Sequence, residues 1–128
     1  MDYLLDTHTF LWFINADNKL SSKARNIIEN TENAKFISIA SFWEIAIKIK
    51  IGSLQIKMPF EELKKHVTDN GFNILPITFE NTASICNLPN HHKDPFDRII
   101  IVQAIDEKMN IISKDNNFRN YNVKVIWD

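Results

Sequence analysis

Cysteine is nearly absent from this sequence, since Cys86 is the only one among 128 residues. One thiol cannot form an internal disulfide, and it also excludes a zinc site built from several cysteine ligands. A chain without disulfides suits a reducing compartment, so we expect a cytoplasmic protein. An unpaired cysteine usually behaves as a small apolar residue, and we expect Cys86 to lie in the core.

Glycine and proline are scarce as well, with two and four residues that each occur singly. We therefore expect no linker, repeat or low-complexity segment, and one domain that spans residues 1–128. Long apolar runs are missing, because stretches such as 10–14 and 99–102 are far too short to cross a bilayer. The first residues also lack the basic and apolar regions of a secretory signal, so no membrane association is expected.

An excess of either charge is also lacking, since the formal net charge is -1. This balance excludes a uniformly basic surface. Any nucleic acid would have to be bound by a local patch or through a bound metal ion. Hydrophobic residues make up 45% of the chain, which is enough for a sizeable core.

Short apolar segments alternate along the chain with longer segments of helical character. The expected strands cover residues 3–5, 35–39, 73–77, 111–113 and 123–127. The expected helices cover residues 9–15, 23–31, 59–70, 78–87 and 95–109. Alternating strands and helices predict an α/β fold in which a parallel sheet carries helices on both faces.

The segment 45–51 is ambiguous by periodicity alone. Its apolar residues alternate with period two, which favours a strand. The same sequence places Phe42, Ile45 and Ile49 on one helical face, and Gly52 could follow the helix as its C′ residue. The length of the whole segment favours a helix.

Four acidic residues stand where an apolar run ends or where a helix begins. They are Asp6, Glu44, Asp97 and Asp115. A buried carboxylate is costly unless a positive group neutralises it, and four such residues suggest one shared partner. Mg²⁺ and Mn²⁺ prefer carboxylate oxygen, so a divalent cation is the natural candidate.

Two of these acids have a purely structural alternative at a helix start. Asp6 could cap the helix that begins near residue 9. Asp97 could complete a capping box with Asp94, because Pro95 fits the first helical position between them. Arg98 could contact a phosphate or simply be solvated.

The other two acids also have structural alternatives. Glu44 could form a salt bridge with Lys48 at i+4, and Asp115 could be a turn residue. His91 and His92 lie in a polar loop without the spacing of a zinc site, so we expect them to position the helix start or to touch substrate. The tryptophans are expected in the core or at an interface rather than as base-stacking platforms; they are Trp12, Trp43 and Trp127.

Four segments together resemble the PIN-domain ribonucleases, in particular the short toxins of VapBC toxin–antitoxin systems. They are Leu-Leu-Asp-Thr-His at 4–8, Ser-Phe-Trp-Glu-Ile at 41–45, Leu-Pro-Asn-His-His-Lys-Asp-Pro-Phe-Asp-Arg at 88–98 and Ile-Ile-Ser-Lys-Asp at 111–115. The resemblance covers essentially the whole chain. It implies a three-layer α/β/α sandwich with a central, mainly parallel sheet.

The resemblance also implies the chemistry and its residues. An acidic pocket would bind Mg²⁺ or Mn²⁺ and cut single-stranded RNA, leaving a 5′-phosphate and a 3′-hydroxyl. The matching catalytic and metal-binding acids are Asp6, Glu44, Asp97 and Asp115. Residues expected to contact substrate are Thr7, Asp94, Arg98 and Ser113, of which Ser113 replaces a threonine common in the family. The expected partners are RNA, a small antitoxin protein and a second copy of the chain.

Three other functions compete with the toxin. A stand-alone RNA-processing nuclease would lack an antitoxin gene beside its own. A PIN-like module that binds without cutting would be expected to lack some of the four acids, and all are present. A phosphoacceptor signalling domain would carry adjacent acids after its first strand, whereas Asp6 is followed by Thr7 and His8.

Overall fold

The computed structural model describes residues 1–128 and contains a five-stranded sheet in which every neighbouring pair is parallel. The strands are β1 (Asp2–Leu5), β2 (Ala34–Ser38), β3 (Phe72–Leu75), β4 (Asn110–Ile112) and β5 (Val125–Ile126), in the order β3-β2-β1-β4-β5. The direction of strand addition reverses between β1 and β4. Open α/β sheets bind ligands in the crevice outside the carboxyl ends of the strands at such a reversal.

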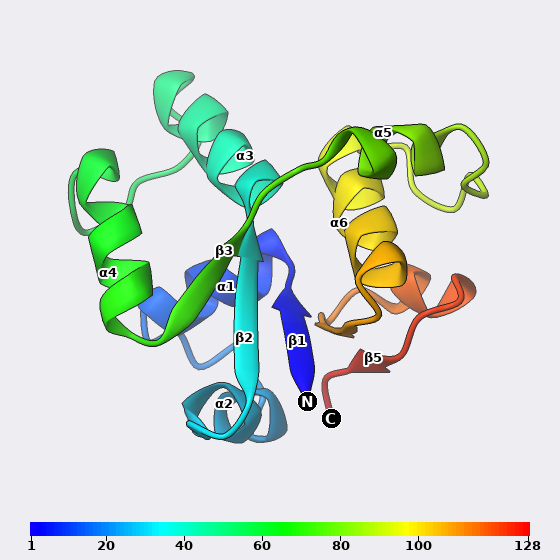
Figure 1. Ribbon diagram of the computed structural model, residues 1–128. Coiled ribbons are helices and arrows are strands. Elements are labelled where there is room, and N and C mark those ends of the chain that lie inside the picture. Colours follow the sequence, from blue (N-terminus) through cyan, green and yellow to red (C-terminus); the bar gives the residue numbers. More distant parts are fainter.

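Helices cover both faces of the sheet. They are α1 (Thr7–Ile14), α2 (Ser22–Glu29), α3 (Ile39–Lys50), α4 (Leu63–Asp69), α5 (Phe79–Ile85) and α6 (Pro95–Asp106), with short 3-10 helices η1 (Phe60–Glu62) and η2 (Asn116–Asn120). Figure 1 shows α5 and α6 to the right of β2, α4 to the left of β3 and α2 below the strands. The buried apolar residues of α1, α2 and α4 belong to one hydrophobic cluster, and those of α6 belong to the other. The expected α/β sandwich with a central parallel sheet is confirmed.

The strand sequences produce two separate cores. Successive side chains of a strand point to opposite faces, so Tyr3 and Leu5 enter one hydrophobic cluster while Leu4 enters the other. The same alternation separates Ile111 from Ile112 on β4. All of these side chains are buried, which explains why the strands are almost continuously apolar.

Local signals in the sequence set several helix boundaries. Ser21 caps α2 by accepting a hydrogen bond of 3.0 Å from the backbone N–H of Ala24. Pro95 occupies the first turn of α6, as expected. The ambiguous segment is helical and belongs to α3, and Gly52 follows that helix with a φ of +81°. Packing of one face of α3 into the core outweighs the period-two pattern, because Ile45 is fully buried there.

Some sequence expectations need correction. Cys86 is exposed at the end of α5, so its assignment to the core was wrong. Helix α6 ends at Asp106, before the expected Met109, because Lys108 adopts a positive φ of 56° that interrupts the helix. Trp43 is 59% exposed and is therefore not a core residue, whereas Trp127 is buried. None of the helices combines the length and the apolarity needed to span a membrane.

Replacing the buried Phe10 tests the core on the α1 side of the sheet. Phe10 is fully buried and contacts Phe42 and Phe72 edge to face, at ring-centroid distances of 5.9 Å and 6.3 Å. We expect Phe10→Ala to lower the free energy of unfolding by about 3–5 kcal/mol, measured by urea denaturation. Phe79→Ala is the matched control, because Phe79 is 82% exposed. A Phe10→Ala cost no larger than the control's would contradict this packing.

Candidate functional site

Asp6 lies at the carboxyl end of β1, where the strand order reverses, and its side chain is buried. One carboxylate oxygen accepts a hydrogen bond of 2.9 Å from the backbone N–H of Thr9, so Asp6 caps α1. The other accepts a hydrogen bond of 2.6 Å from the hydroxyl of Ser113, which follows β4. Burial raises the pKa of Asp6, although both hydrogen bonds oppose the shift. Asp6 can therefore cap α1 and also lie in the crevice at the end of β1.

Asp97 lies in the first turn of α6 and does not complete the expected capping box. Asp94 is the N-cap, and its carboxylate accepts from the backbone N–H groups of Phe96 and Asp97 at 2.7 Å and 3.2 Å. The side chain of Asp97 forms no bond in this cap, so it remains available in the crevice.

The electrostatic surroundings of Asp97 show which acids are its neighbours. Burial raises the pKa of Asp97, the negative charges of Asp94, Asp6 and Glu44 add to the shift in that order of size, and the resulting pKa is about 7. His92 acts in the opposite direction. The acids contributed by β1, α3 and α6 are therefore close enough to repel one another.

Glu44 reaches this group from α3, and only 8% of its side chain is exposed. The ammonium group of Lys48 lies 2.9 Å from a Glu44 carboxylate oxygen, so the i+4 salt bridge considered from the sequence is present. The lysine offsets part of the cost of burying the carboxylate. The same Glu44 still acts on Asp97 electrostatically, so the salt bridge does not remove it from the group.

Asp115 follows β4 and is held by His92, a contact that the sequence pattern did not indicate. The Nε2 atom of His92 lies 2.9 Å from an Asp115 oxygen, and its Nδ1 atom lies 3.1 Å from the hydroxyl of Tyr121. The ring of His92 also stacks on Phe118, with a centroid distance of 4.6 Å. A neutral imidazole satisfies both polar contacts, accepting from Tyr121 and donating to Asp115. The role expected for His92 from the sequence, to position the helix start or to touch substrate, remains a prediction.

A potential ligand group forms where these elements meet. One side-chain atom each of His92, Asp97 and Asp115 lies within 4.8 Å of the others. The carboxylate oxygens fit a hard cation such as Mg²⁺ or Mn²⁺. His92 already bonds Asp115, and this contact suits a residue that orients a metal-binding carboxylate. The assignment of the four acids as metal ligands remains a prediction.

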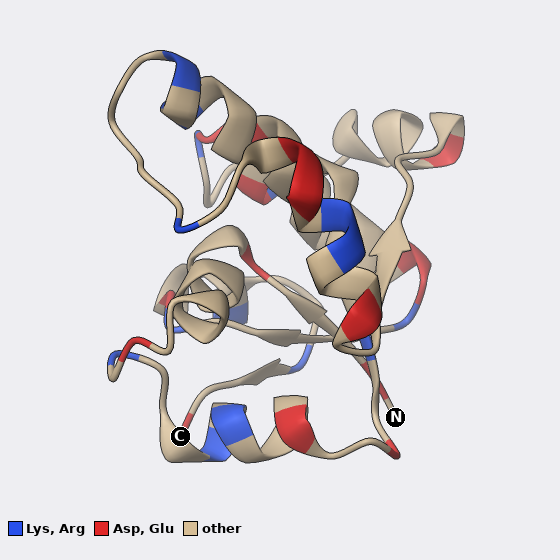
Figure 2. Cartoon of the chain, turned by 90° about the vertical axis from the view of Figure 1, so that its left-hand side faces the viewer, with Lys and Arg blue, Asp and Glu red and all other residues tan.

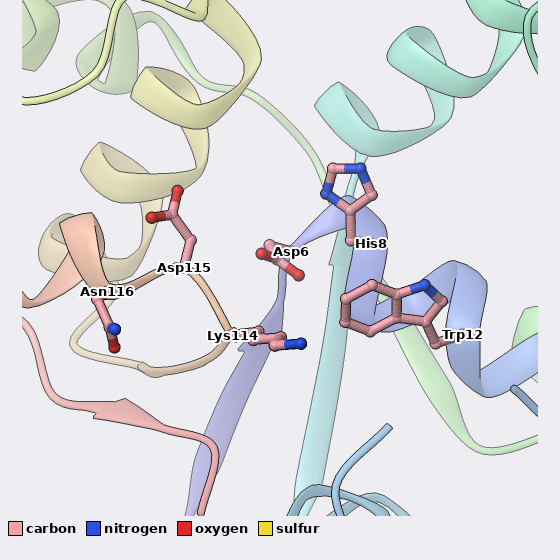
Figure 3. Close-up of a pocket in the computed structure, with 6 residues that line it drawn as sticks. All are labelled: Asp6, His8, Trp12, Lys114, Asp115 and Asn116. Atoms are coloured by element: carbon pink, nitrogen blue, oxygen red, sulfur yellow. The ribbon is translucent and has the colours of Figure 1, made fainter. Parts of the chain in front are cut away.

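A cleft of about 550 Å³ opens beside these acids. It is lined by Asp6, His8, Trp12, Lys114, Asp115 and Asn116. Figure 3 shows His8 and Trp12 on one wall, Asp115 and Asn116 on the opposite wall, and Asp6 and Lys114 between them. The cleft lies where a substrate could reach the carboxylates.

Comparison with known proteins agrees with this architecture. The family model for the PIN domain matches residues 3–124. The chain belongs to the PIN-domain family. It is 28% identical over 123 residues to Ribonuclease VapC22 of Mycobacterium tuberculosis, covering 92% of this chain and 90% of that protein. The resemblance noted from the sequence motifs is therefore confirmed.

Solved structures of distant relatives share the fold of this PIN domain. One is VapBC2 from Rickettsia felis, bound to a DNA fragment from its promoter, with a TM-score of 0.74 and 18% identity over the whole of both chains. Another is FitAcB from Neisseria gonorrhoeae, with a TM-score of 0.67 and 15% identity, covering 97% of this chain and 96% of that chain.

The residues expected to bind substrate in this PIN domain make supporting contacts. The buried hydroxyl of Thr7 donates to Ser41 at 2.9 Å. Ser113 connects two of the acids, because its hydroxyl donates to Asp6 and accepts from the backbone N–H of Asp115 at 3.0 Å. The substrate contacts expected for Thr7 and Ser113 remain predictions.

Arg98 and Asp94 stabilise the start of α6 in the PIN domain. The Arg98 guanidinium donates to the Asn90 side chain at 3.0 Å and to the backbone carbonyl of His92 at 3.2 Å. Arg98 therefore holds the loop that carries His92, while Asp94 caps the helix. The substrate contacts expected for these two residues also remain predictions.

Figure 2 shows where the charged residues of the PIN domain lie along the chain. Lys and Arg are interspersed there with Asp and Glu along the helices. This pattern agrees with the net charge of -1 and leaves RNA binding dependent on local groups.

The raised pKa of Asp97 predicts how the stability of the metal-free PIN domain depends on pH. Between the ordinary value of 3.8 and about 7, folded Asp97 keeps a proton that the unfolded chain has lost. Its contribution to stability is therefore present at low pH and is lost as pH rises through about 7. We expect the urea midpoint in EDTA to fall as pH rises from about 4 to about 7 and to level off above that range.

Asp97→Asn should remove much of this fall, because asparagine carries no titrating proton. Asp2→Asn is the matched control, since Asp2 is exposed at the other end of β1 and should leave the pH dependence intact. Equal pH dependence in wild type and Asp97→Asn would contradict the assigned shift.

Proposed function

We propose that this PIN domain is a ribonuclease that cleaves single-stranded RNA with Mg²⁺ or Mn²⁺ and acts as the VapC-type toxin of a toxin–antitoxin pair. The similarity to Ribonuclease VapC22 over nearly the whole chain supports the activity. The observation that carries the proposal is the position of Asp97, which is partly buried and near the carboxylates of Asp6 and Glu44. Such a group needs positive charge, and a phosphodiesterase supplies it as a divalent ion.

Each acid has a distinct role in this proposal. Asp6 and Asp97 hold the ion, and Glu44 either binds a second ion or orients the attacking water. Asp115 acts directly or through a water molecule, with His92 fixing its orientation. When bound, the ion neutralises the scissile phosphate and acidifies a water molecule.

The remaining predicted residues serve the same site. Ser113 bonds Asp6 and the backbone N–H of Asp115, Thr7 bonds Ser41 on α3, and Asp94 and Arg98 fix the α6 end of the site. A single strand is the proposed substrate because its splayed backbone can enter a cleft next to the acids. A cytoplasmic location belongs to this proposal, since its RNA substrate is found there.

A cleavage assay with matched aspartate variants tests the activity. We expect wild-type protein to cut tRNA or rRNA in Mg²⁺ or Mn²⁺, to lose cleavage in EDTA, and to leave 5′-phosphate and 3′-hydroxyl ends on end mapping. Asp6→Asn should lower the rate at least about 100-fold, because it removes a charged oxygen from the metal site. Asp2→Asn, at the exposed start of β1, should cut like wild type. Full activity of folded Asp6→Asn in Mg²⁺ would rule out this role.

A protein partner is supported by an apolar stripe on α3. Its exposed side chains recur at every fourth position and are Ile39, Trp43, Ile47 and Ile51, from 40% to 71% exposed. Exposed apolar patches of this kind mark protein interaction sites. We propose a small antitoxin as one partner and a second copy of the chain as another.

Co-expression with the neighbouring gene tests the toxin role. We expect a small open reading frame that abuts or overlaps this gene on its upstream side. Expression of the PIN domain alone should arrest growth, and co-expression of that open reading frame should restore it, because the antitoxin blocks cleavage. Asp97→Asn should not arrest growth. Growth arrest that the neighbouring product fails to relieve would instead favour a stand-alone RNA-processing nuclease.

A further inference from the structure

The cleft beside the acids has one aromatic wall that the proposed chemistry does not use. His8 and Trp12 are one helical turn apart on α1, and their rings stack at a centroid distance of 5.9 Å and an angle of 30°. His8 is exposed and Trp12 is half-buried. Figure 3 shows both side chains on the same wall of the cleft, to the right of Asp6 and Lys114.

Packing against a buried aromatic side chain holds Trp12 in place. Its ring meets Trp127 edge to face, with centroids 5.7 Å apart, and Trp127 is buried. The backbone carbonyl of Trp127 accepts a hydrogen bond from Ser21, which fixes this end of the chain against α2. One part of Trp12 therefore packs on the core while another lines the cleft. A ring held in this way loses little conformational entropy when a ligand stacks on it.

The rest of the lining suits a nucleotide. Lys114 is the only Lys or Arg among the lining residues, and Asn116 offers an amide donor and acceptor on the opposite wall. Asp6 lies between the aromatic wall and Asp115, so a base on that wall would bring its phosphate toward the acids. Stacking on aromatic rings combined with a cation for the backbone is the usual way to bind single strands.

We propose that the wall formed by His8 and Trp12 is a nucleobase-binding subsite, and that Lys114 contacts a phosphate of the same RNA strand. The proposal rests on the proposed ribonuclease function. It revises the sequence-based expectation for Trp12, which serves both as a core residue and as a stacking platform. The subsite binds bases by stacking and so accepts several sequences, with Asn116 placed to prefer some base edges over others.

Binding of oligoribonucleotides with single abasic positions tests the stacking. Kd is measured by fluorescence anisotropy in Mg²⁺ on an Asp97→Asn background, with gels to check that the RNA stays intact. At one position we expect loss of the base to weaken binding about 10-fold. The same loss should cost less than about 2-fold when Trp12→Leu is added, and Trp12→Phe should restore most of the penalty.

A second set of variants avoids any disturbance of the core. His8→Ala changes an exposed residue and should weaken binding of the intact strand but reduce the abasic penalty. His66→Ala on α4 is the matched control and should change neither, because His66 lies outside the cleft. In the cleaving protein, His8→Ala should raise KM and leave kcat nearly unchanged, since the ring binds substrate and does not enter the chemistry.

Salt dependence isolates the role of Lys114. Lys114→Ala should reduce the slope of log K against log salt by about 0.7, the value for one phosphate contact on a single strand. Lys124→Ala is the matched control, because Lys124 is also exposed but lies outside the cleft. Equal slopes for Lys114→Ala and wild type would overturn the phosphate contact.

The outcomes separate this subsite from the activity on which it rests. In one outcome the wild type cleaves RNA while no abasic position weakens binding, and in another the abasic penalty is the same with and without Trp12→Leu. Either result would overturn the subsite and leave the proposed ribonuclease activity intact. Abasic coupling to Trp12 without cleavage of any RNA would support the subsite and overturn the proposed activity.

Discussion

Repulsion among carboxylates is the constraint around which this site is built. Asp97 is partly buried, and this burial together with the charges of Asp94, Asp6 and Glu44 raises its pKa to about 7. Among the groups nearby, the Lys48 ammonium pairs with Glu44 and the His92 ring bonds Asp115. A proton or a cation must relieve the remaining repulsion, and a divalent ion relieves it at neutral pH without protonating the ligands.

Chain topology brings these groups together. Reversal of strand order places the ends of β1 and β4 side by side, and Ser113 joins Asp6 to the backbone of Asp115 across them. The starts of α3 and α6 approach the same edge, and these two helices pack against each other. Asp6 also caps α1, so one side chain stabilises the fold and supplies charge to the site. Function here is tied to secondary-structure boundaries rather than to a mobile loop.

Most of the architecture follows from local patterns, whereas the contacts within the site do not. Alternating apolar segments indicated the parallel sheet, and Pro95 indicated the start of α6. The bond between His92 and Asp115 joins residues that are 23 positions apart, and no periodic pattern in the sequence predicts it. The exposure of Cys86 does not follow from its residue type, because residue type gives only an average burial. The position of Cys86 at the end of α5 determines its exposure in this structure. Sequence patterns identify candidate acids but not the neighbours that orient them.

The cleft contains two kinds of side chain that have different tasks in the proposed nuclease, namely acids and groups able to contact a base. In the proposed mechanism the carboxylates and a bound cation act on the phosphodiester, which is the same at every nucleotide, and so they do not distinguish one RNA from another. Discrimination must come from groups that contact bases, and the lining residues able to do so are His8, Trp12 and Asn116. These residues lie outside the acidic set, and two of them are on α1, two and six residues after Asp6. Substitutions on that helix could change the preferred RNA while leaving the catalytic acids and their supporting bonds in place.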